Sequence, residues 1–241
     1  MKKIICLWAS PRNISTALMY SFAQRSETKV IDEPFYAYYL SHVNPNIYHP
    51  GKKEILNSQS SDFNQILNYI NSKCNYQLLF IKNMTHHLKG SSLSFALNWI
   101  NIILTRSPKK SLTSFSKVIT KPTQDDVGYK LQYEAALKFK EMGANFYILN
   151  SDDLLNNPKK ELKKLCHFSS ISFDDNMLKW SKGGIKEDGV WAKYWYENVH
   201  NSMGFKKAKI DSAIKIDGPL TVLEKECNYY YQKLINMGDQ N

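Results

Sequence analysis

Short apolar segments of strand length alternate along this chain with segments of helical periodicity. The strand-like segments are residues 4–8, 29–31, 77–81, 101–104 and 146–149. The helical patterns lie between or after them, at residues 15–25, 62–73, 92–99, 109–118, 130–142, 159–168 and 221–236. Strands and helices that alternate in one chain favour a mainly parallel sheet with helices on both faces. We therefore predict a three-layer α/β fold with a central, mainly parallel sheet flanked by helices.

The length of the chain, 241 residues, suits one sizeable α/β domain. We find no internal repeat and no low-complexity linker, so residues 1–241 are predicted to form a single domain. Residues 41–61 and 181–218 have weak periodicity and many Gly, Asn, Ser and Lys residues. These two ranges are predicted to be long surface loops, which in such folds often cover a site.

The charge of the chain favours a polyanionic partner. The formal net charge is +10 and the isoelectric point is about 9.2. A nucleic acid, an anionic membrane surface and a multiply phosphorylated small molecule would each fit such a charge. A composition rich in lysine and asparagine explains the charge equally simply, so the charge alone does not choose among these partners.

Cysteine usage and the hydropathy pattern predict a cytoplasmic protein. The four cysteines are far apart and form no CxxC pair, which indicates neither a zinc site nor a disulfide framework; they are Cys6, Cys74, Cys166 and Cys227. The apolar start of the chain stops at Pro11-Arg12, which is too early for a signal peptide. No stretch approaches the roughly 20 apolar residues of a membrane span.

Residues 4–22, IICLWASPRNISTALMYSF, read as a strand, a tight loop and the start of a helix. A helix that starts at Ser15-Thr16 would direct backbone N–H groups and the positive end of its dipole at an anion. The loop of nucleotide triphosphatases, G-x-x-x-x-G-K-[ST], is not present, because there is no glycine and Ser15 occupies the lysine position. The cation is instead Arg12, three residues upstream. The pattern predicts a P-loop-type fold whose loop holds an anion without the usual lysine.

The stretch SPRNISTAL resembles the 5′-phosphosulfate loop of sulfotransferases, which use 3′-phosphoadenosine-5′-phosphosulfate (PAPS). That loop usually reads P-[KR]-S-G-[ST]-T, and Pro11, Arg12, Ser15 and Thr16 match it. Asn13 and Ile14 stand where Ser and Gly are usual, so the turn must form without its glycine. Asparagine tolerates the left-handed backbone conformation, which makes Asn13 suitable for the turn, whereas Ile14 is the unusual residue.

The resemblance implies roles for the residues of this loop. Arg12 would stabilise the negative charge that develops on the bridging oxygen of the departing phosphate. The 5′-phosphate would be bound by the hydroxyl groups of Ser15 and Thr16 and by backbone amides of residues 13–17, which include Asn13 and Ala17.

A second match is ILTRSPKKSLTSF, in which an apolar strand ends at Arg106 and Ser114 follows eight residues later. In sulfotransferases, a strand-end arginine and a helical serine at this spacing bind the 3′-phosphate. The chemistry suits that role, because a guanidinium forms a forked contact with phosphate and a hydroxyl adds a neutral donor. The alternative is a basic strand end followed by a solvated serine.

Two later segments resemble the same family. FYILNSDDLLNNPKKELKKLCHF is similar to its strand–turn–helix segment, but the tyrosine that abuts adenine in the family falls on Ser151. Adenine packing must therefore come from elsewhere. WSKGGIKEDGVWAKYW is similar to the R-K-G-x-x-G-x-W segment that closes over the 3′-phosphate, with Lys182, Gly183 and Gly184 matching and Ser181 in place of the arginine. A plain glycine-rich loop is the alternative.

The first candidate for the catalytic base is Glu33, in VIDEPFYAYYL. It lies 21 residues after Arg12 and resembles the position of the catalytic Glu in tyrosylprotein sulfotransferases and in bacterial trehalose sulfotransferase. At a strand end beside aromatic residues, its carboxyl could be partly desolvated and its pKa raised. The alternatives are an exposed loop acid and an ion-pair partner of Arg12.

The second candidate lies in FIKNMTHHL, since cytosolic sulfotransferases carry a lysine and a catalytic histidine as K-x-H at this strand end. Here Lys82 and the pair His86-His87 are offset from that spacing by two residues. Adjacent histidines in a loop point in different directions, so we expect one of them to face the site. Glu33 ranks first as base and His86 or His87 second, with Lys82 as an electrostatic helper. The sequence does not predict a metal site at the histidine pair, because no third ligand lies at a suitable spacing.

The resemblance implies a PAPS-dependent sulfotransferase that transfers a sulfuryl group to a hydroxyl or amine, without a metal. Its expected partners are PAPS or PAP (adenosine 3′,5′-bisphosphate) and a small-molecule or glycan acceptor, rather than nucleic acid. Sugar, lipid, peptide, amine and small phenol all stay open as acceptors. The alternatives are a P-loop small-molecule kinase with Mg²⁺ and ATP, a non-catalytic nucleotide- or RNA-binding protein, and a sulfotransferase fold that has lost its activity.

Overall fold

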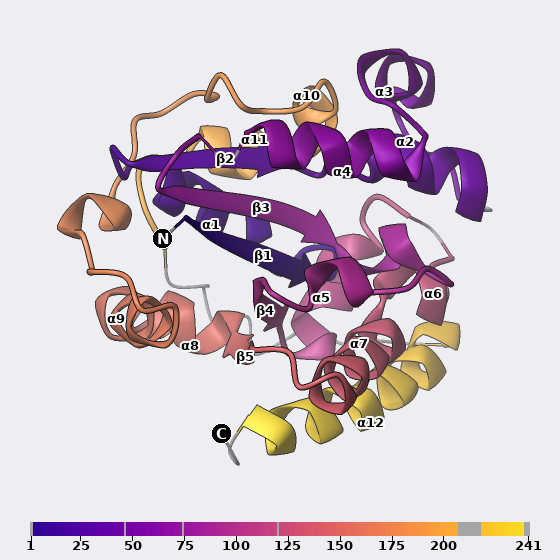
Figure 1. The fold of residues 1–241 in the computed structure, drawn as a ribbon. Coiled ribbons are helices and arrows are strands. Elements are labelled where there is room, and N and C mark those ends of the chain that lie inside the picture. Colours follow the sequence, from indigo (N-terminus) through magenta and orange to yellow (C-terminus); the bar gives the residue numbers. More distant parts are fainter. Residues whose placement is uncertain (1, 46, 74, 120, 207–217, 239–241) are drawn as a thin grey trace.

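A parallel sheet forms the middle layer of the molecule (Figure 1). The computed structural model describes residues 2–45, 47–73, 75–119, 121–206 and 218–238. Within these ranges the strands are β1 (Lys3–Ala9), β2 (Thr28–Asp32), β3 (Leu78–Met84), β4 (Ile100–Thr105) and β5 (Phe146–Asn150). They pair in the order β2-β3-β1-β4-β5, and every pair is parallel. The predicted three-layer α/β architecture is confirmed, with each strand close to its predicted position.

The central strand β1 is apolar on both sides because helices cover both faces of the sheet. Ile5 and Leu7 pack into one apolar cluster, whereas Cys6 and Trp8 pack into the cluster on the opposite face. A strand that is buried on both faces has a continuous apolar sequence rather than an alternating one. The run at residues 4–8 was recognisable for this reason.

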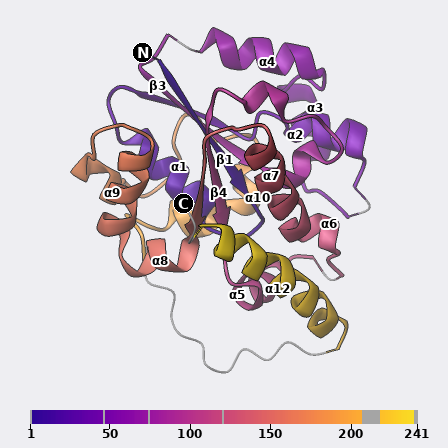
Figure 2. The same cartoon turned by 60° about the horizontal axis from the view of Figure 1, so that its bottom comes forward.

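Helices form the outer layers (Figures 1 and 2). Side chains of α1 (Ser15–Ala23), α8 (Ser151–Asn156) and α9 (Pro158–Phe168) pack into the cluster on one face. Side chains of α4 (Phe63–Ser72), α7 (Tyr129–Glu141) and α12 (Pro219–Gly238) pack into the cluster on the other face. The remaining short elements are α2 (Tyr36–Tyr38), η1 (Tyr39–Val43), α3 (Lys52–Ser58), η2 (Thr85–Leu88), η3 (Ser94–Ala96), α5 (Pro108–Phe115), α6 (Gln124–Val127), η4 (Asp175–Leu178), α10 (Ala192–Trp195) and α11 (Glu197–His200).

The predicted helix at residues 92–99 is wrong: the structure has only the 3₁₀ turn η3 there. The side-chain amide of Asn101 donates to the carbonyls of Ala96 and Trp99, each at 3.0 Å. These carbonyls therefore find a partner without a continuing helix, and β4 begins directly afterwards.

The predicted loops at residues 41–61 and 181–218 contain short helices. α3 lies in the first range, and α10 and α11 lie in the second. Helices of one or two turns are too short to show a clear periodicity, which is why the sequence pattern missed them. Residues 207–217 of the second range lie outside the described residues.

The strand order creates a crevice at the carboxyl ends of β1 and β4. After β1 the chain moves to the β2 edge of the sheet, and after β4 it moves to the β5 edge. Ligands of open parallel sheets bind where neighbouring strands continue in opposite directions in this way. The predicted phosphate loop follows β1, and Arg106 follows β4. None of the helices in the described ranges has both the length and the apolar character needed to cross a membrane.

Candidate active site

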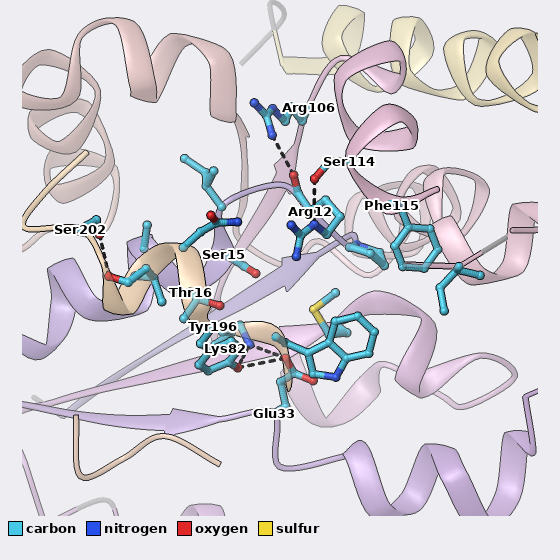
Figure 3. Close-up of a pocket in the computed structure, with 18 of the residues that line it drawn as sticks. Arg12, Ser15, Thr16, Glu33, Lys82, Arg106, Ser114, Phe115, Tyr196 and Ser202 are labelled. Carbon is cyan, nitrogen blue, oxygen red and sulfur yellow. Dashed lines mark hydrogen bonds and ion pairs between the residues drawn. The ribbon is translucent and has the colours of Figure 1, made fainter. Parts of the chain in front are cut away.

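A cavity of about 610 Å³ lies at the carboxyl ends of the strands (Figure 3). The residues predicted to bind the donor that line it are Arg12, Ser15, Thr16, Ala17, Arg106 and Ser114. The residues predicted to act in catalysis that line it, besides Arg12, are Glu33, Lys82, His86 and His87. The fold thus brings together side chains from four different strand ends.

The loop after β1 forms its turn without glycine. Arg12 and Ile14 adopt left-handed backbone conformations, with φ of 63° and 64°. The expectation that Asn13 would be the left-handed residue is wrong, because Ile14 itself has the conformation usual for glycine at its position. Ile14 is also the N-cap of α1 and makes no side-chain cap hydrogen bond. Amides of the first turn of α1 therefore have no side-chain cap from this residue, and a ligand could take its place.

Buried polar contacts hold the loop in this conformation. The side-chain amide of Asn13 donates to the carbonyl of Leu104, and the Ser151 hydroxyl donates to the Asn13 carbonyl at 2.7 Å. Asn13 is thus turned into the core and does not line the cavity. Ser151, which replaces an adenine-contacting tyrosine in the sequence comparison, fastens the loop instead.

Arg12 and Arg106 lie close together on the side of the cavity formed by the loop after β1 (Figure 3). Arg12 Nε donates to Ser114 Oγ at 2.9 Å, and Arg106 Nη1 donates to the backbone carbonyl of Arg12 at 2.9 Å. Arg106 Nε lies 3.5 Å from Asp152 Oδ1, whereas no carboxylate among the described residues forms an ion pair with Arg12. Burial, and then the charge of Arg106, lower the pKa of Arg12. Because guanidinium groups keep their charge, an anion here would relieve their mutual repulsion.

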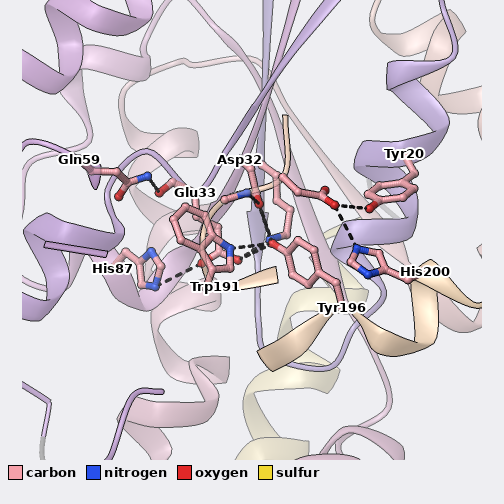
Figure 4. A network of polar contacts seen from close by, with 11 residues as sticks. Tyr20, Asp32, Glu33, Gln59, His87, Trp191, Tyr196 and His200 are labelled. Atoms are coloured by element: carbon pink, nitrogen blue, oxygen red, sulfur yellow. Dashed lines mark hydrogen bonds and ion pairs between the residues drawn. The ribbon is translucent and has the colours of Figure 1, made fainter. Parts of the chain in front are cut away.

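A carboxylate–lysine cluster lies where β2 and β3 end (Figure 4). Asp32 and Lys82 are direct partners in the pairing of these strands. Lys82 Nζ donates to Asp32 Oδ1 at 2.9 Å and also contacts Glu33 Oε1. The Lys82 side chain is only 1% exposed. Glu33 is therefore neither an exposed loop acid nor a partner of Arg12, as the two alternatives supposed, but a buried partner of Lys82.

Tyr196 divides the hydrogen bonds of this cluster unequally between the carboxylates. Its hydroxyl oxygen accepts from Lys82 Nζ at 2.6 Å and from Trp191 Nε1 at 2.9 Å. Its single proton can go to one acceptor, and the Asp32 oxygens lie at 2.8 and 2.9 Å, whereas Glu33 Oε1 lies at 3.4 Å.

The backbone amide of Gly189 gives Asp32 a further donor, at 3.1 Å. Asp32 is therefore the well-satisfied carboxylate of the cluster. Glu33 depends mainly on Lys82, and its second oxygen, Oε2, lies 3.8 Å from His87 Nε2. Glu33 is thus the carboxylate with capacity for another hydrogen-bond partner.

The surroundings favour Glu33 over the histidines as a proton acceptor. Burial raises the pKa of Glu33, and the charge of Lys82 opposes this effect. Burial, with the charge of His49 second, lowers the pKa of His86 to about 3, and burial lowers the pKa of His87 well below its usual value. The His87 ring is held between Tyr36 and Tyr39, with ring centroids at 4.7 and 4.8 Å. Such imidazoles are neutral and weakly basic at neutral pH.

The late glycine-rich segment lies elsewhere, since Lys182, Gly183 and Gly184 do not line the cavity. The Gly183 amide donates to the His200 carbonyl at 2.8 Å. A side chain at Gly184 would meet Asp188 Oδ2 at 2.9 Å, the atom that also binds Tyr20 and His200 (Figure 4). In the structure this segment packs around that polar network, and residues after it reach the cavity.

Cavity residues that the motif comparison missed come mainly from this later part of the chain. They include Trp195, Tyr196, Val199, Ser202 and Phe205. The aromatic residues at 191–196 were the one available signal, because a dense aromatic cluster suggests either core or pocket wall. The structure shows both: Trp191 is buried in the core, whereas Trp195 lines the cavity.

Known proteins match this chain over most of its length. Residues 1–224 match the family described as sulfotransferase domain. Two curated proteins of Arabidopsis thaliana, Branched-chain-amino-acid aminotransferase-like protein 2 and protein 1, are 35% and 34% identical to it over 207 and 209 residues. The matches cover 84% and 86% of this chain but 36% and 37% of those proteins, so the chain spans little more than a third of their length.

Solved structures show the same fold. The sulfotransferase domain from the Synechococcus PCC 7002 olefin synthase has a TM-score of 0.65 at 16% identity, and the similarity covers 96% of each chain. The sulfotransferase domain from the curacin biosynthetic pathway has a TM-score of 0.62 at 16% identity, covering 96% of this chain and 98% of that one. With the match over residues 1–224, the chain belongs to the sulfotransferase domain family.

Proposed function

We propose that this protein transfers a sulfuryl group from PAPS to a hydroxyl or amine of an acceptor. One observation carries the proposal: Arg12 and Arg106 line the same cavity as the buried carboxylate Glu33. Such a cavity has cations for a donor with several negative charges and a base for the acceptor. Family membership supports the transfer of a sulfuryl group, and the choice of donor rests on the arginines.

The residues fit an adenosine that is phosphorylated at both the 3′ and the 5′ position. The 5′-phosphate would be bound by Arg12, by the hydroxyls of Ser15 and Thr16 and by the first turn of α1. The 3′-phosphate would be bound by Arg106 and Ser114, and the Arg12–Ser114 hydrogen bond links the two groups of residues. Ile14 already has the left-handed conformation, so the loop does not depend on a glycine.

The apolar contacts that adenine needs must come from other residues, because Ser151 cannot supply the ring of a tyrosine. Leu155, Val199 and Phe205 line the cavity and are suitable residues for this role. They come from α8, from α11 and from the segment after it. The late segment would thus close over adenine with apolar side chains. Lys182, Gly183 and Gly184 would support this segment from outside the cavity.

In the transfer, the acceptor oxygen or nitrogen bonds to sulfur as the bond from sulfur to the phosphate oxygen breaks, and PAP leaves. Glu33 takes the proton of the acceptor at its less occupied oxygen, Oε2. Lys82 orients Glu33 through its ion pair with Oε1. The guanidinium of Arg12 stabilises the negative charge on the departing phosphate oxygen. His86 and His87 complete the wall beside Glu33 without carrying charge.

Thermal unfolding in the presence of nucleotides tests the donor. We expect PAP to raise the melting temperature without added metal, and ATP with Mg²⁺ to raise it less. Formation of PAP from PAPS in the presence of acceptors then tests transfer. A larger shift with ATP and Mg²⁺ than with PAP would contradict the proposal and favour the kinase alternative.

A further inference from the structure

One wall of the cavity is a continuous apolar surface that the donor residues do not use. Phe115 and Ile119 belong to a single apolar cluster, and Ile47 and Trp195 pack against that cluster. All four side chains also line the cavity. Figure 3 shows Phe115 beside Arg12, on the side away from Ser202. This wall therefore adjoins the atoms that would take part in the transfer rather than the proposed adenine contacts.

The wall near Glu33 is aromatic and uncharged. The centroid of the Tyr36 ring lies 4.7 Å from that of the His87 ring and 5.6 Å from that of the His49 ring. The Tyr36 hydroxyl also forms a hydrogen bond with His49 Nδ1, at 2.8 Å. Burial lowers the pKa of His49 to about 4, so this imidazole is neutral at neutral pH, like those of His86 and His87. These rings supply contact area but no cation for an acceptor.

The charged groups on this side of the cavity are unfavourable for an anion. Asp32, Glu33 and Lys82 together carry two negative charges and one positive charge, and Asp126 also lines the cavity. An acceptor with its own carboxylate or phosphate would be repelled here, while Arg12 and Arg106 are taken by the donor. Among the described residues that line the cavity, the remaining cation is Lys206, which directly follows Phe205, one of the proposed adenine contacts. Against this wall a sugar would meet mainly apolar side chains, and each of its hydroxyls left there without a partner costs free energy.

We infer that the acceptor of this enzyme is an uncharged alcohol or phenol with an apolar body, which packs against Ile47, Phe115, Ile119 and Trp195 and directs its hydroxyl at Glu33. This inference rests on the proposed function. It favours a small-molecule acceptor over a glycan, whereas the sequence leaves both classes of acceptor open. The acceptor oxygen bonds to sulfur, its proton passes to Glu33 and PAP is the leaving group, so no further reactant is needed.

Calorimetric titration with three probes tests the inference. The probes are 2-naphthol, 2-naphthoate, which has the same rings but a negative charge, and glucose, which is neutral but polar. Each is titrated into protein with and without saturating PAP. We expect 2-naphthol to bind at least about ten-fold more tightly than either other probe, because only its rings can bury apolar area without bringing in a charge. Equal or tighter binding of naphthoate or glucose, or no binding of naphthol, would overturn the inference.

A pair of neighbouring residues supplies a matched control. Ile119 lines the wall, whereas Val118 is 48% exposed and does not line the cavity. We expect Ile119→Ser to weaken 2-naphthol about ten-fold and Val118→Ser to leave it unchanged, with PAP affinity unchanged in both. Ile47→Ser, at a half-buried wall position, replaces Ile119→Ser if the latter fails to fold. Equal naphthol affinity in the Ile119 and Val118 variants would contradict the inference, whereas failure of PAP to bind the unmodified protein would contradict the proposed donor.

Discussion

Where β1 and β4 end, the cavity has two arginines, and Arg12 has no ion-paired carboxylate among the described residues. Where β2 and β3 end, it has two carboxylates around one lysine, all buried. In the first region no carboxylate in the part of the chain that the structure describes forms an ion pair with Arg12, whereas in the second the charge of Lys82 is compensated by two carboxylates that lie beside it. One sheet edge thus holds two regions of different electrostatic character, and in the proposed function the first binds the anionic donor while the second accepts the proton.

Removing the proton acceptor is the most severe way to test this division. We expect Glu33→Gln to lower kcat by about 10²- to 10⁴-fold, because the amide cannot take the acceptor proton. The Kd for PAP, measured by calorimetry, should stay unchanged, since Lys82 keeps Asp32 as partner. Glu54→Gln removes an exposed glutamate that also pairs with a lysine, and serves as control. Normal turnover in Glu33→Gln would transfer the role of base to His86 or His87.

Removing a cation from the other region should affect binding first. We expect Arg106→Ala to weaken PAP by about 10- to 100-fold but adenosine 5′-monophosphate far less, because only PAP has a 3′-phosphate for this guanidinium. Lys110→Ala is the matched control, since Lys110 also pairs with Asp152 but does not line the cavity. Equal losses for the two nucleotides, measured by calorimetry, would show that Arg106 does not recognise the 3′-phosphate.

The hydroxyl of Tyr196 offers a finer test of the cluster of Asp32, Glu33 and Lys82. Glu33 accepts a proton only when ionised, so turnover should fall as the pH drops through the pKa of Glu33. The charge of Lys82 lowers this pKa, and without the Tyr196 hydroxyl Asp32 would compete more strongly for Lys82, so less of that cation would be left for Glu33. We expect Tyr196→Phe to move the acid limb of the kcat/KM profile up by about 0.5–1 pH unit.

The control for this shift is Tyr194, which lies on α10, two residues before Tyr196. Tyr194→Phe removes an exposed hydroxyl that donates to Glu54, and it should leave the pH profile unchanged. A uniform loss of activity at every pH in Tyr196→Phe would mean that Tyr196 only supports the fold.

The smallest expected effect concerns the strained loop of the cation-rich region. Ile14→Gly removes the whole side chain and Ile14→Ala removes all of it beyond Cβ, and only glycine adopts a φ of 64° without strain. We expect the free energy of unfolding of Ile14→Gly to exceed that of Ile14→Ala by about 1 kcal/mol, as measured by urea denaturation. Ala17→Gly, within α1, should show the opposite preference, because glycine weakens a helix interior. Equal stability of the two Ile14 variants would show that the loop relaxes out of the left-handed conformation.

Much of the fold and part of the site were predictable because their signals are local. Parallel strands covered on both faces have continuous apolar sequences, and α9 has its proline at the first turn. Arg12 and Arg106 could be singled out because each lies next to a strand end in a short motif. By contrast, the sequence pattern at 92–99 predicts a helix, whereas the contacts of Asn101 with Ala96 and Trp99 satisfy carbonyls that a continuing helix would have used.

The partners of Glu33 were not predictable in the same way. Lys82 was expected near a histidine base, yet it pairs with Asp32 and Glu33, which lie about 50 residues earlier in the chain. Tyr196 reaches Asp32 across 164 residues. No periodicity or spacing links such positions, because their distance in space depends on how the late segment packs across the ends of β2 and β3.

The amino-acid sequence alone determined the order of strands and helices along the chain, the helix that starts directly after the first loop and the two arginines at neighbouring strand ends. These features follow from local backbone preferences and from the apolar pattern of buried strands. Only the tertiary structure decided which carboxylate has fewer hydrogen-bond partners, that Ile14 takes the conformation of a glycine and that an apolar wall adjoins Arg12. The physical reason is that hydrogen-bond sharing and burial depend on side chains far apart in the chain, which only the packed fold brings together.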